Sequence, residues 1–224
     1  MKNGQPGEIT RVRRTTEQAQ AWYDTLSPVY DLVADPFERP YRESGIELLD
    51  PADGERIADV GCGTGSALVP IARSVGETGS VTGLDIAEGM CHRAQEKVAS
   101  SAVSSRVDVV QGDALHLPFR SASLDALFTS FTLELFDTPD IPVVLEECRR
   151  ALRDGGRLCV VSLSKRNAGV LTSLYERIHS TVPRYVDCRP IFVGQMLEEA
   201  GFEVVERRDE RMWGLPLEIV LATA

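Results

Sequence analysis

Three aspartates are the residues of this 224-residue chain whose placement best suits ligand binding. Asp59, Asp85 and Asp113 each stand at the end of a short apolar run of the kind that forms a buried parallel strand. Because the carboxyl ends of parallel strands meet at one edge of a sheet, we expect the three carboxylates to line a single crevice. Carboxylates at that edge suit a ribose diol, an adenine amino group or a positively charged group.

A turn with three alternate glycines, Gly61, Gly63 and Gly65, follows the first of these runs. Glycine lets the backbone turn tightly enough for a ligand to touch main-chain atoms. A dinucleotide site would need another glycine where this chain has Ser66, and its pyrophosphate would be repelled by Asp59. The same aspartate favours a ligand with an ammonium or sulfonium group. S-adenosylmethionine carries both groups, so it is the expected cofactor.

The order of these segments also resembles a known family. The matching segments are residues 59–65, 83–86 with Met90 downstream, 112–114 and 153–158. They resemble the class I S-adenosylmethionine-dependent methyltransferases, and more narrowly they are similar to the ubiquinone and menaquinone biosynthesis C-methyltransferase group and its small-molecule relatives. The resemblance implies S-adenosylmethionine as cofactor and S-adenosylhomocysteine as product. It also implies a Rossmann-like seven-stranded sheet of order 3-2-1-4-5-7-6, with strand 7 antiparallel.

The sheet edge and the resemblance together predict one cofactor-binding set. Its members are Asp59, Gly61, Cys62, Gly63, Gly65, Asp85, Ile86, Met90, Gly112, Asp113, Ala114 and Ser130. By resemblance, Tyr23 and Tyr30 match a tyrosine-bearing amino-terminal motif that closes over the methionine end of the cofactor. Other interpretations stay open, because Asp85 and Asp113 would also serve as helix caps and Met90 as core filler.

Apolar runs that alternate with helical patterns predict a doubly wound α/β fold. Strands are expected at residues 56–60, 80–84, 107–111, 124–130 and 157–162. Helices are expected at residues 66–75, 87–100 and 141–152. The segments 202–208 and 217–221 break the alternation, because only a short link separates two strand-like runs. We expect them to form a hairpin with one strand antiparallel to the rest of the sheet.

The pattern divides the chain into a terminus, a lid and a cofactor-binding domain. Residues 1–14 are polar and are expected to form a disordered terminus. Residues 15–50 are expected to form a helical lid, whose apolar stripe is interrupted at residues 27–28. Residues 51–224 form the methyltransferase domain, with an insertion at residues 167–189 that is expected to border the ligand crevice.

Methyl transfer from a sulfonium requires an acceptor in line with the methyl group and the exclusion of water, so a dedicated base is optional. Glu134, in the polar segment after the fourth strand, is the candidate catalytic residue. It would accept a proton, orient the acceptor or bind a cation, or it would be a solvated helix residue. The candidate substrate-binding residues are Phe131, Glu134, Tyr175 and Tyr185. No metal-ligand cluster is visible, so no metal is expected.

The main functional hypothesis is in-line transfer of a methyl group from S-adenosylmethionine to a small, apolar or amphipathic acceptor. A non-catalytic S-adenosylmethionine-binding module with a regulatory or scaffold role is the alternative. A nicotinamide-dependent oxidoreductase is a third possibility, which Ser66 and Asp59 disfavour.

The composition indicates which binding partners and which cellular compartment to expect. A net charge of −10 disfavours a nucleic-acid partner, because a phosphate backbone would be repelled. Five scattered cysteines suit a reducing cytosol, so a cytoplasmic location is expected. No stretch is long and apolar enough to predict a membrane span. Transient membrane contact is expected only if the acceptor is a lipid or a quinone.

Overall fold

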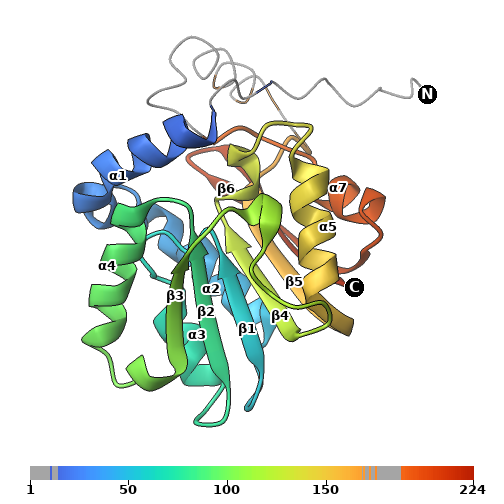
Figure 1. The fold of residues 1–224 in the computed structure, drawn as a ribbon. Helices are drawn as coiled ribbons and strands as arrows, with labels where there is room; N and C mark the ends of the chain where they lie inside the picture. Colours follow the sequence, from blue (N-terminus) through green and yellow to red (C-terminus); the bar gives the residue numbers. More distant parts are fainter. Residues whose placement is uncertain (1–10, 12–14, 168, 170–171, 173–174, 176–187) are drawn as a thin grey trace.

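The computed structural model describes residues 11, 15–167, 169, 172, 175 and 188–224. These residues form a seven-stranded sheet of order β3-β2-β1-β4-β5-β7-β6, with helices on both faces (Figure 1). The first five strands are parallel, and β7 is antiparallel to both of its neighbours, β5 and β6. The predicted strand order and the antiparallel hairpin are therefore confirmed.

The five parallel strands, β1 to β5, place their carboxyl ends along one edge of the sheet. The strand bounds are β1 Arg56–Val60, β2 Ser80–Asp85, β3 Val107–Gln111, β4 Leu124–Ser130, β5 Leu152–Leu163, β6 Glu203–Met212 and β7 Leu215–Thr223. Four strands, β2, β5, β6 and β7, are longer than the apolar runs predicted. The prediction of β5 began at residue 157, but the strand starts at Leu152, directly after the preceding helix, and includes the glycine pair at residues 155–156.

Two layers of helices enclose the sheet. The helices are α1 Thr16–Val33, α2 Asp35–Leu49, α3 Leu68–Ser74, α4 Glu88–Ala99, α5 Ile141–Ala151 and α7 Val193–Glu199, with short 3-10 turns η1 Ser104–Arg106, η2 Ala114–His116 and η3 Leu133–Leu135. One apolar cluster joins α2, α3 and α4 to one face, and a second joins α5 and α7 to the other. Each strand of the sheet centre is therefore buried on both sides, which explains its continuous apolar sequence.

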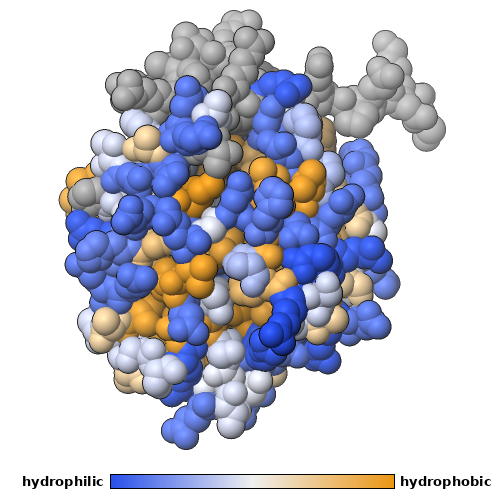
Figure 2. Space-filling model, viewed as in Figure 1, coloured by the Kyte–Doolittle hydropathy of each residue, from blue (hydrophilic) through white to orange (hydrophobic). Residues whose placement is uncertain are grey.

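The connection between β3 and β4 contains η2 but no α-helix. Figure 2 shows the same face of the molecule as Figure 1. Apolar side chains reach the surface near the centre of this face, and polar residues surround them. Leu115 and Phe119 of this connection are half-buried against the cluster that α5 and α7 cover. This part of the sheet is thus covered by a short segment that places Asp113 close to the strand ends.

The first helix runs without a break through residues 27–28, where its apolar stripe is interrupted. Pro28 lacks the backbone N–H that would bond to the carbonyl of Asp24, four residues earlier. The hydroxyl of Ser27 donates a hydrogen bond to that carbonyl instead, at 3.0 Å. The helix begins with a capping box in which Thr15 and Gln18 bond reciprocally.

Gly45 brings α2 against the centre of the sheet. A Cβ at this position would stand 2.5 Å from Val161 Cγ2 and 3.0 Å from Phe128 Cε2, and both of those side chains are fully buried. The helix backbone therefore packs directly on β4 and β5. This close approach fixes the distance from the sheet at which the preceding turns of α2 pass over the strand ends.

We expect Gly45→Ala to destabilise the protein by about 1 to 2 kcal/mol in urea unfolding, because overpacking outweighs the helix propensity that alanine adds. Glu43→Gln is the matched control, since Glu43 lies on the exposed face of the same helix and pairs only with exposed Arg39. An alanine variant as stable as the control would mean that the packing here is loose.

Candidate cofactor and acceptor site

The glycine turn after β1 uses its three glycines in different ways. Gly61, Gly63 and Gly65 all have positive φ, at 74°, 52° and 79°. A Cβ at Gly61 would collide with the side chain of Thr132, and one at Gly65 would lie 3.0 Å from Ala94 Cβ. A Cβ at Gly63 would meet no described protein atom within 4 Å. Packing therefore requires two of the glycines, whereas the third borders open space that a ligand can enter.

Asp85 lies at the end of β2 and shapes this turn. One carboxylate oxygen accepts a hydrogen bond from the amide of Gly63 and the other from the amide of Ala87, both at 2.9 Å. Burial raises the pKa of Asp85, and the bonds from these backbone amides oppose that rise. Ala87 is the N-cap of α4, so the capping interpretation describes part of the role of Asp85. Each carboxylate oxygen keeps a further lone pair, which a ribose hydroxyl could use.

Asp59, near the end of β1, is a buried acid with an unsatisfied oxygen. It is 2% exposed, and its Oδ1 has no hydrogen-bond partner among the described residues. Burial raises the pKa of Asp59 to about 7; nearby Arg42 opposes the rise and Asp85 adds to it. A buried carboxylate oxygen without a donor is costly, and a cationic ligand group would remove that cost.

Arg42, which the sequence analysis did not single out, supplies the positive charge beside Asp59. It lies on α2, is 7% exposed, and its Nη2 is 2.6 Å from Asp35 Oδ1. The signal that would have identified it is its spacing, because it falls on the same helix stripe as Gly45 and Leu49, which face the sheet. A buried arginine and a buried aspartate that interact electrostatically match the carboxylate and ammonium of an amino acid.

The predicted adenine side of the crevice lies at the ends of β2 and β3. Asp113 accepts a hydrogen bond from the amide of Leu115 at 3.0 Å and so caps η2, as one of the two interpretations proposed. Met90 is fully buried on α4, and Ile86 is half-buried. Of the other predicted members, Gly112 and Ala114 follow β3, and Cys62 lies in the glycine turn after β1; Cys62 and Ala114 are buried. An adenine contact from this group stays a prediction.

The first helix lies over the glycine turn and the start of α4. Asp24 accepts a hydrogen bond from the amide of Gly89 at 2.7 Å. Asp31 accepts a hydrogen bond from the hydroxyl of Thr64 and forms an ion pair with Lys97 at 3.1 Å. These contacts tie α1 to the glycine turn and to α4, as a lid would require, and Tyr23 on this helix is half-buried.

Glu134, the candidate catalytic residue, lies in η3 beyond β4 and is 0% exposed. Its Oε1 accepts a hydrogen bond from the amide of Leu163 at 3.2 Å, while Oε2 has no partner among the described residues. Burial raises the pKa of Glu134 to about 7, against the opposing effect of its hydrogen bonds. Arg189, also buried, binds Thr138 and the carbonyl of Phe136 and lies close enough to interact electrostatically with Glu134.

The other acceptor-side candidates are less closely grouped. Phe131 has a positive φ of 52° and is buried in the apolar cluster on the α2 face. Ser130 is half-buried, and its carbonyl accepts a hydrogen bond from the hydroxyl of Thr132. Tyr175 donates a hydrogen bond to the carbonyl of Cys188 at 2.7 Å. Tyr185 and most of the predicted insertion lie outside the described residues.

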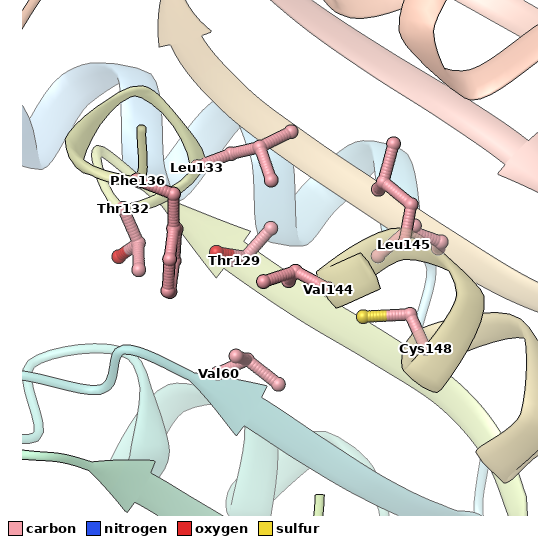
Figure 3. A pocket seen from close by; sticks show the side chains of 9 residues that line it. Val60, Thr129, Thr132, Leu133, Phe136, Val144, Leu145 and Cys148 are labelled. Atoms are coloured by element: carbon pink, nitrogen blue, oxygen red, sulfur yellow. The ribbon is translucent and has the colours of Figure 1, made fainter. Parts of the chain in front are cut away.

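A small apolar cavity lies on the opposite face of the sheet from α2, beneath η3 (Figure 3). Its lining comes from β1, β4, β5, η3 and α5 and comprises Val60, Thr129, Thr132, Leu133, Phe136, Val144, Leu145, Cys148 and Leu158. The lining carries no charged group, so it does not suit the charged end of the cofactor. No group of three or more potential metal ligands occurs among the described residues, and none of their helices is long and apolar enough to span a membrane.

Known proteins match both the sequence and the fold. Residues 57–156 match a family model described as a methyltransferase domain. The chain is 37% identical over 136 residues to nocamycin O-methyltransferase of Saccharothrix syringae, covering 61% of this chain and 48% of that protein. It is 31% identical over 163 residues to demethylmenaquinone methyltransferase of Staphylococcus aureus, covering 71% of this chain and 66% of that protein. The chain thus spans about half to two thirds of these relatives.

Solved structures share the fold at low sequence identity. The [4+2]-cyclase SpnF matches with a TM-score of 0.74 and 19% identity, over 94% of this chain and 97% of that one. Geranyl diphosphate C-methyltransferase of Streptomyces coelicolor, solved with S-adenosyl-L-homocysteine, matches with a TM-score of 0.68 and 15% identity, over 83% and 79%. Since one of these neighbours is a cyclase, the fold alone does not determine the reaction.

Proposed function

This chain belongs to the class I S-adenosylmethionine-dependent methyltransferases, and from that premise we propose that it transfers a methyl group to a small, apolar or amphipathic acceptor. The observation that carries the proposal is the unsatisfied oxygen of buried Asp59 beside buried Arg42. These two groups suit the amino-acid end of the cofactor, whereas the charge of Asp59 would repel a pyrophosphate. When bound, the cofactor supplies a methyl group activated by a sulfonium.

Each part of the crevice has a proposed role in holding the cofactor. Asp59 would accept hydrogen bonds from the ammonium, and Arg42 would bind the carboxylate. Asp85 would accept hydrogen bonds from the ribose hydroxyls, and the open side of Gly63 leaves room for the nucleoside. Asp113 and its neighbours would border the adenine. Helix α1 would exclude water from the reacting groups.

The acceptor side is proposed to lie between η3 and the lid, with Glu134 as one of its polar groups. The net charge of −10 supports a small-molecule acceptor over a nucleic acid. All five cysteines are free, which supports a cytoplasmic location. The two relatives named above are called a nocamycin O-methyltransferase and a demethylmenaquinone methyltransferase, so their likeness supports a small-molecule acceptor without selecting one.

We expect Asp85→Asn to weaken S-adenosylhomocysteine binding about 10- to 150-fold, because a charge-assisted hydrogen bond contributes about 1.5 to 3 kcal/mol. Isothermal titration calorimetry measures this directly. Asp108→Asn is the control, since Asp108 is exposed on β3 away from the crevice. Undiminished binding by the Asp85 variant, or tighter binding of a nicotinamide dinucleotide by the wild type, would contradict the proposed cofactor.

Turnover distinguishes the enzyme from a non-catalytic cofactor-binding module. The protein is incubated with S-adenosylmethionine carrying a deuterated methyl group and a small-molecule extract of the encoding organism. Mass spectrometry is then expected to detect a product heavier by one labelled methyl group. A protein that binds the cofactor but labels no compound would favour the regulatory or scaffold alternative.

A further inference from the structure

One stripe of α2 leads from the core of the sheet to the acceptor side of the crevice. Leu49 is fully buried, Gly45 packs on β4 and β5, and Arg42 is buried beside Asp59. Glu38 continues this stripe one turn further, about 6 Å beyond Arg42 at 1.5 Å per residue. The stripe therefore places Glu38 above the carboxyl ends of β4 and β5, on the same side as Glu134.

Charged and polar groups face Glu38 from each neighbouring element. The hydroxyl of Tyr30, on α1, lies 3.2 Å from both carboxylate oxygens of Glu38. Arg42 and Asp35, on α2 itself, act on it electrostatically, and Glu38 in turn acts on Glu134 of η3. Both Glu38 and Tyr30 are half-buried, so the pair keeps a surface that a ligand can contact. Glu38 is thus within electrostatic range both of Arg42, at the proposed methionine site, and of Glu134.

We propose that Glu38 accepts the proton of the methyl acceptor, and that this acceptor reacts through a weakly acidic hydroxyl group. The inference rests on the proposed methyltransferase function. Glu38 is preferred over Glu134 because the residue that takes the proton must contact the molecule that is methylated. Glu134 is 0% exposed and uses one oxygen to hold the amide of Leu163, whereas Glu38 retains accessible surface.

The proposed step balances without any further reactant. The acceptor O–H bond breaks and its proton moves to the Glu38 carboxylate. A lone pair on the hydroxyl oxygen of the methyl acceptor forms the new bond to the methyl carbon. The electron pair of the broken carbon–sulfur bond stays on sulfur and leaves a neutral thioether. Glu38 then returns its proton to water. A positioned base of this kind contributes about 100- to 10,000-fold to a rate.

Tyr30 is a positioning residue in this scheme, because its hydroxyl donates to Glu38 and fixes the orientation of the carboxylate. Burial raises the pKa of Glu38 to about 7, whereas Arg42 and the hydrogen bond from Tyr30 oppose that rise. A carboxylate with a pKa near neutrality is suited to take a proton at physiological pH. Removing the Tyr30 hydroxyl is expected to raise the pKa of Glu38 further, because its anionic form loses a donor.

The test measures transfer of the deuterated methyl group to the product labelled in the extract, together with S-adenosylhomocysteine affinity. Glu38→Gln is expected to lower the rate at least about 100-fold with unchanged cofactor affinity, and to remove the acidic limb of the pH–rate profile. Tyr30→Phe is expected to shift that limb to higher pH. Glu43→Gln, on the exposed face of the same helix, is the control that should match the wild type.

Each other outcome overturns a definite part of the argument. A Glu38→Gln variant with the wild-type rate and profile would refute the proton-acceptor role, and so would loss of the acidic limb in Glu134→Gln with its retention in Glu38→Gln. Weakened cofactor binding by Glu38→Gln would make the residue part of the cofactor site instead. A wild-type protein that binds cofactor but labels nothing would refute the methyltransferase proposal itself, and the role of Glu38 with it.

Discussion

Gly63→Ala is expected to weaken S-adenosylhomocysteine binding by at least about 100-fold while the protein remains folded. The new methyl group would meet no described protein atom within 4 Å, so it occupies only the space assigned to the nucleoside. The cost to stability is limited to placing alanine at a φ of 52°, about 1 to 2 kcal/mol. Calorimetric titration and thermal unfolding of the same preparation measure the two effects separately.

Gly61→Ala provides the contrasting variant. Its methyl group would collide with Thr132, so this substitution is expected to disrupt folding as well as binding. If Gly63→Ala instead binds the cofactor as tightly as the wild type, the open space beside Gly63 is not the nucleoside site. The proposed orientation of the cofactor would then be wrong.

Asp59→Asn is expected to stabilise the cofactor-free protein at pH 8 by about 2 to 4 kcal/mol while weakening cofactor binding about 100-fold. Burial raises the pKa of Asp59 from 3.8 to about 7, so between these values the folded protein binds more protons than the unfolded chain. Stability contributed by this group is therefore present below pH 4 and is lost as the pH rises through about 7. Because asparagine does not ionise, the variant does not lose this stability as the pH rises.

Urea unfolding at pH 5 and pH 8 checks the sign of this pH dependence of stability. The wild type is expected to lose more stability between these two values than the variant does, and the part of the loss that remains is assigned to Glu38 and Glu134, whose pKa values are raised in the same direction. Asp108→Asn serves again as an exposed control. Equal pH dependence in the variant and the wild type would mean that Asp59 is ionised and paired in the folded protein.

The strand ends and the glycine turn were predictable because their signals are local. An apolar run, a glycine turn and a following carboxylate are read from adjacent residues, and Asp59, Gly63 and Asp85 lie together as the pattern indicated. The order of β7 and β6 came from the family resemblance, because no local pattern distinguishes an inner strand from an edge strand.

Arg42 and Glu38 were not predicted, because their roles depend on tertiary packing. They lie in a helix that precedes the cofactor motifs and carries no motif of its own, and they reach the crevice only because Gly45 lets α2 pack closely on the sheet. The continuity of α1 past Pro28 likewise depends on one contact, since the side chain of Ser27 bonds to the carbonyl that Pro28 leaves unbonded. In both cases one tertiary or side-chain contact, at Gly45 or at Ser27, decides a structure that the surrounding sequence pattern does not indicate.

The interior position of β7 has a consequence for synthesis of the protein. Although β7 follows β6 in the chain, it pairs between β5 and β6. Until residues 215–223 have left the ribosome, β6 has no partner strand and β5 is paired only with β4. Until then the nascent chain exposes the unpaired edge of β5, a surface prone to intermolecular pairing. Chaperone demand during translation should therefore be concentrated in the interval between completion of β5 and emergence of β7.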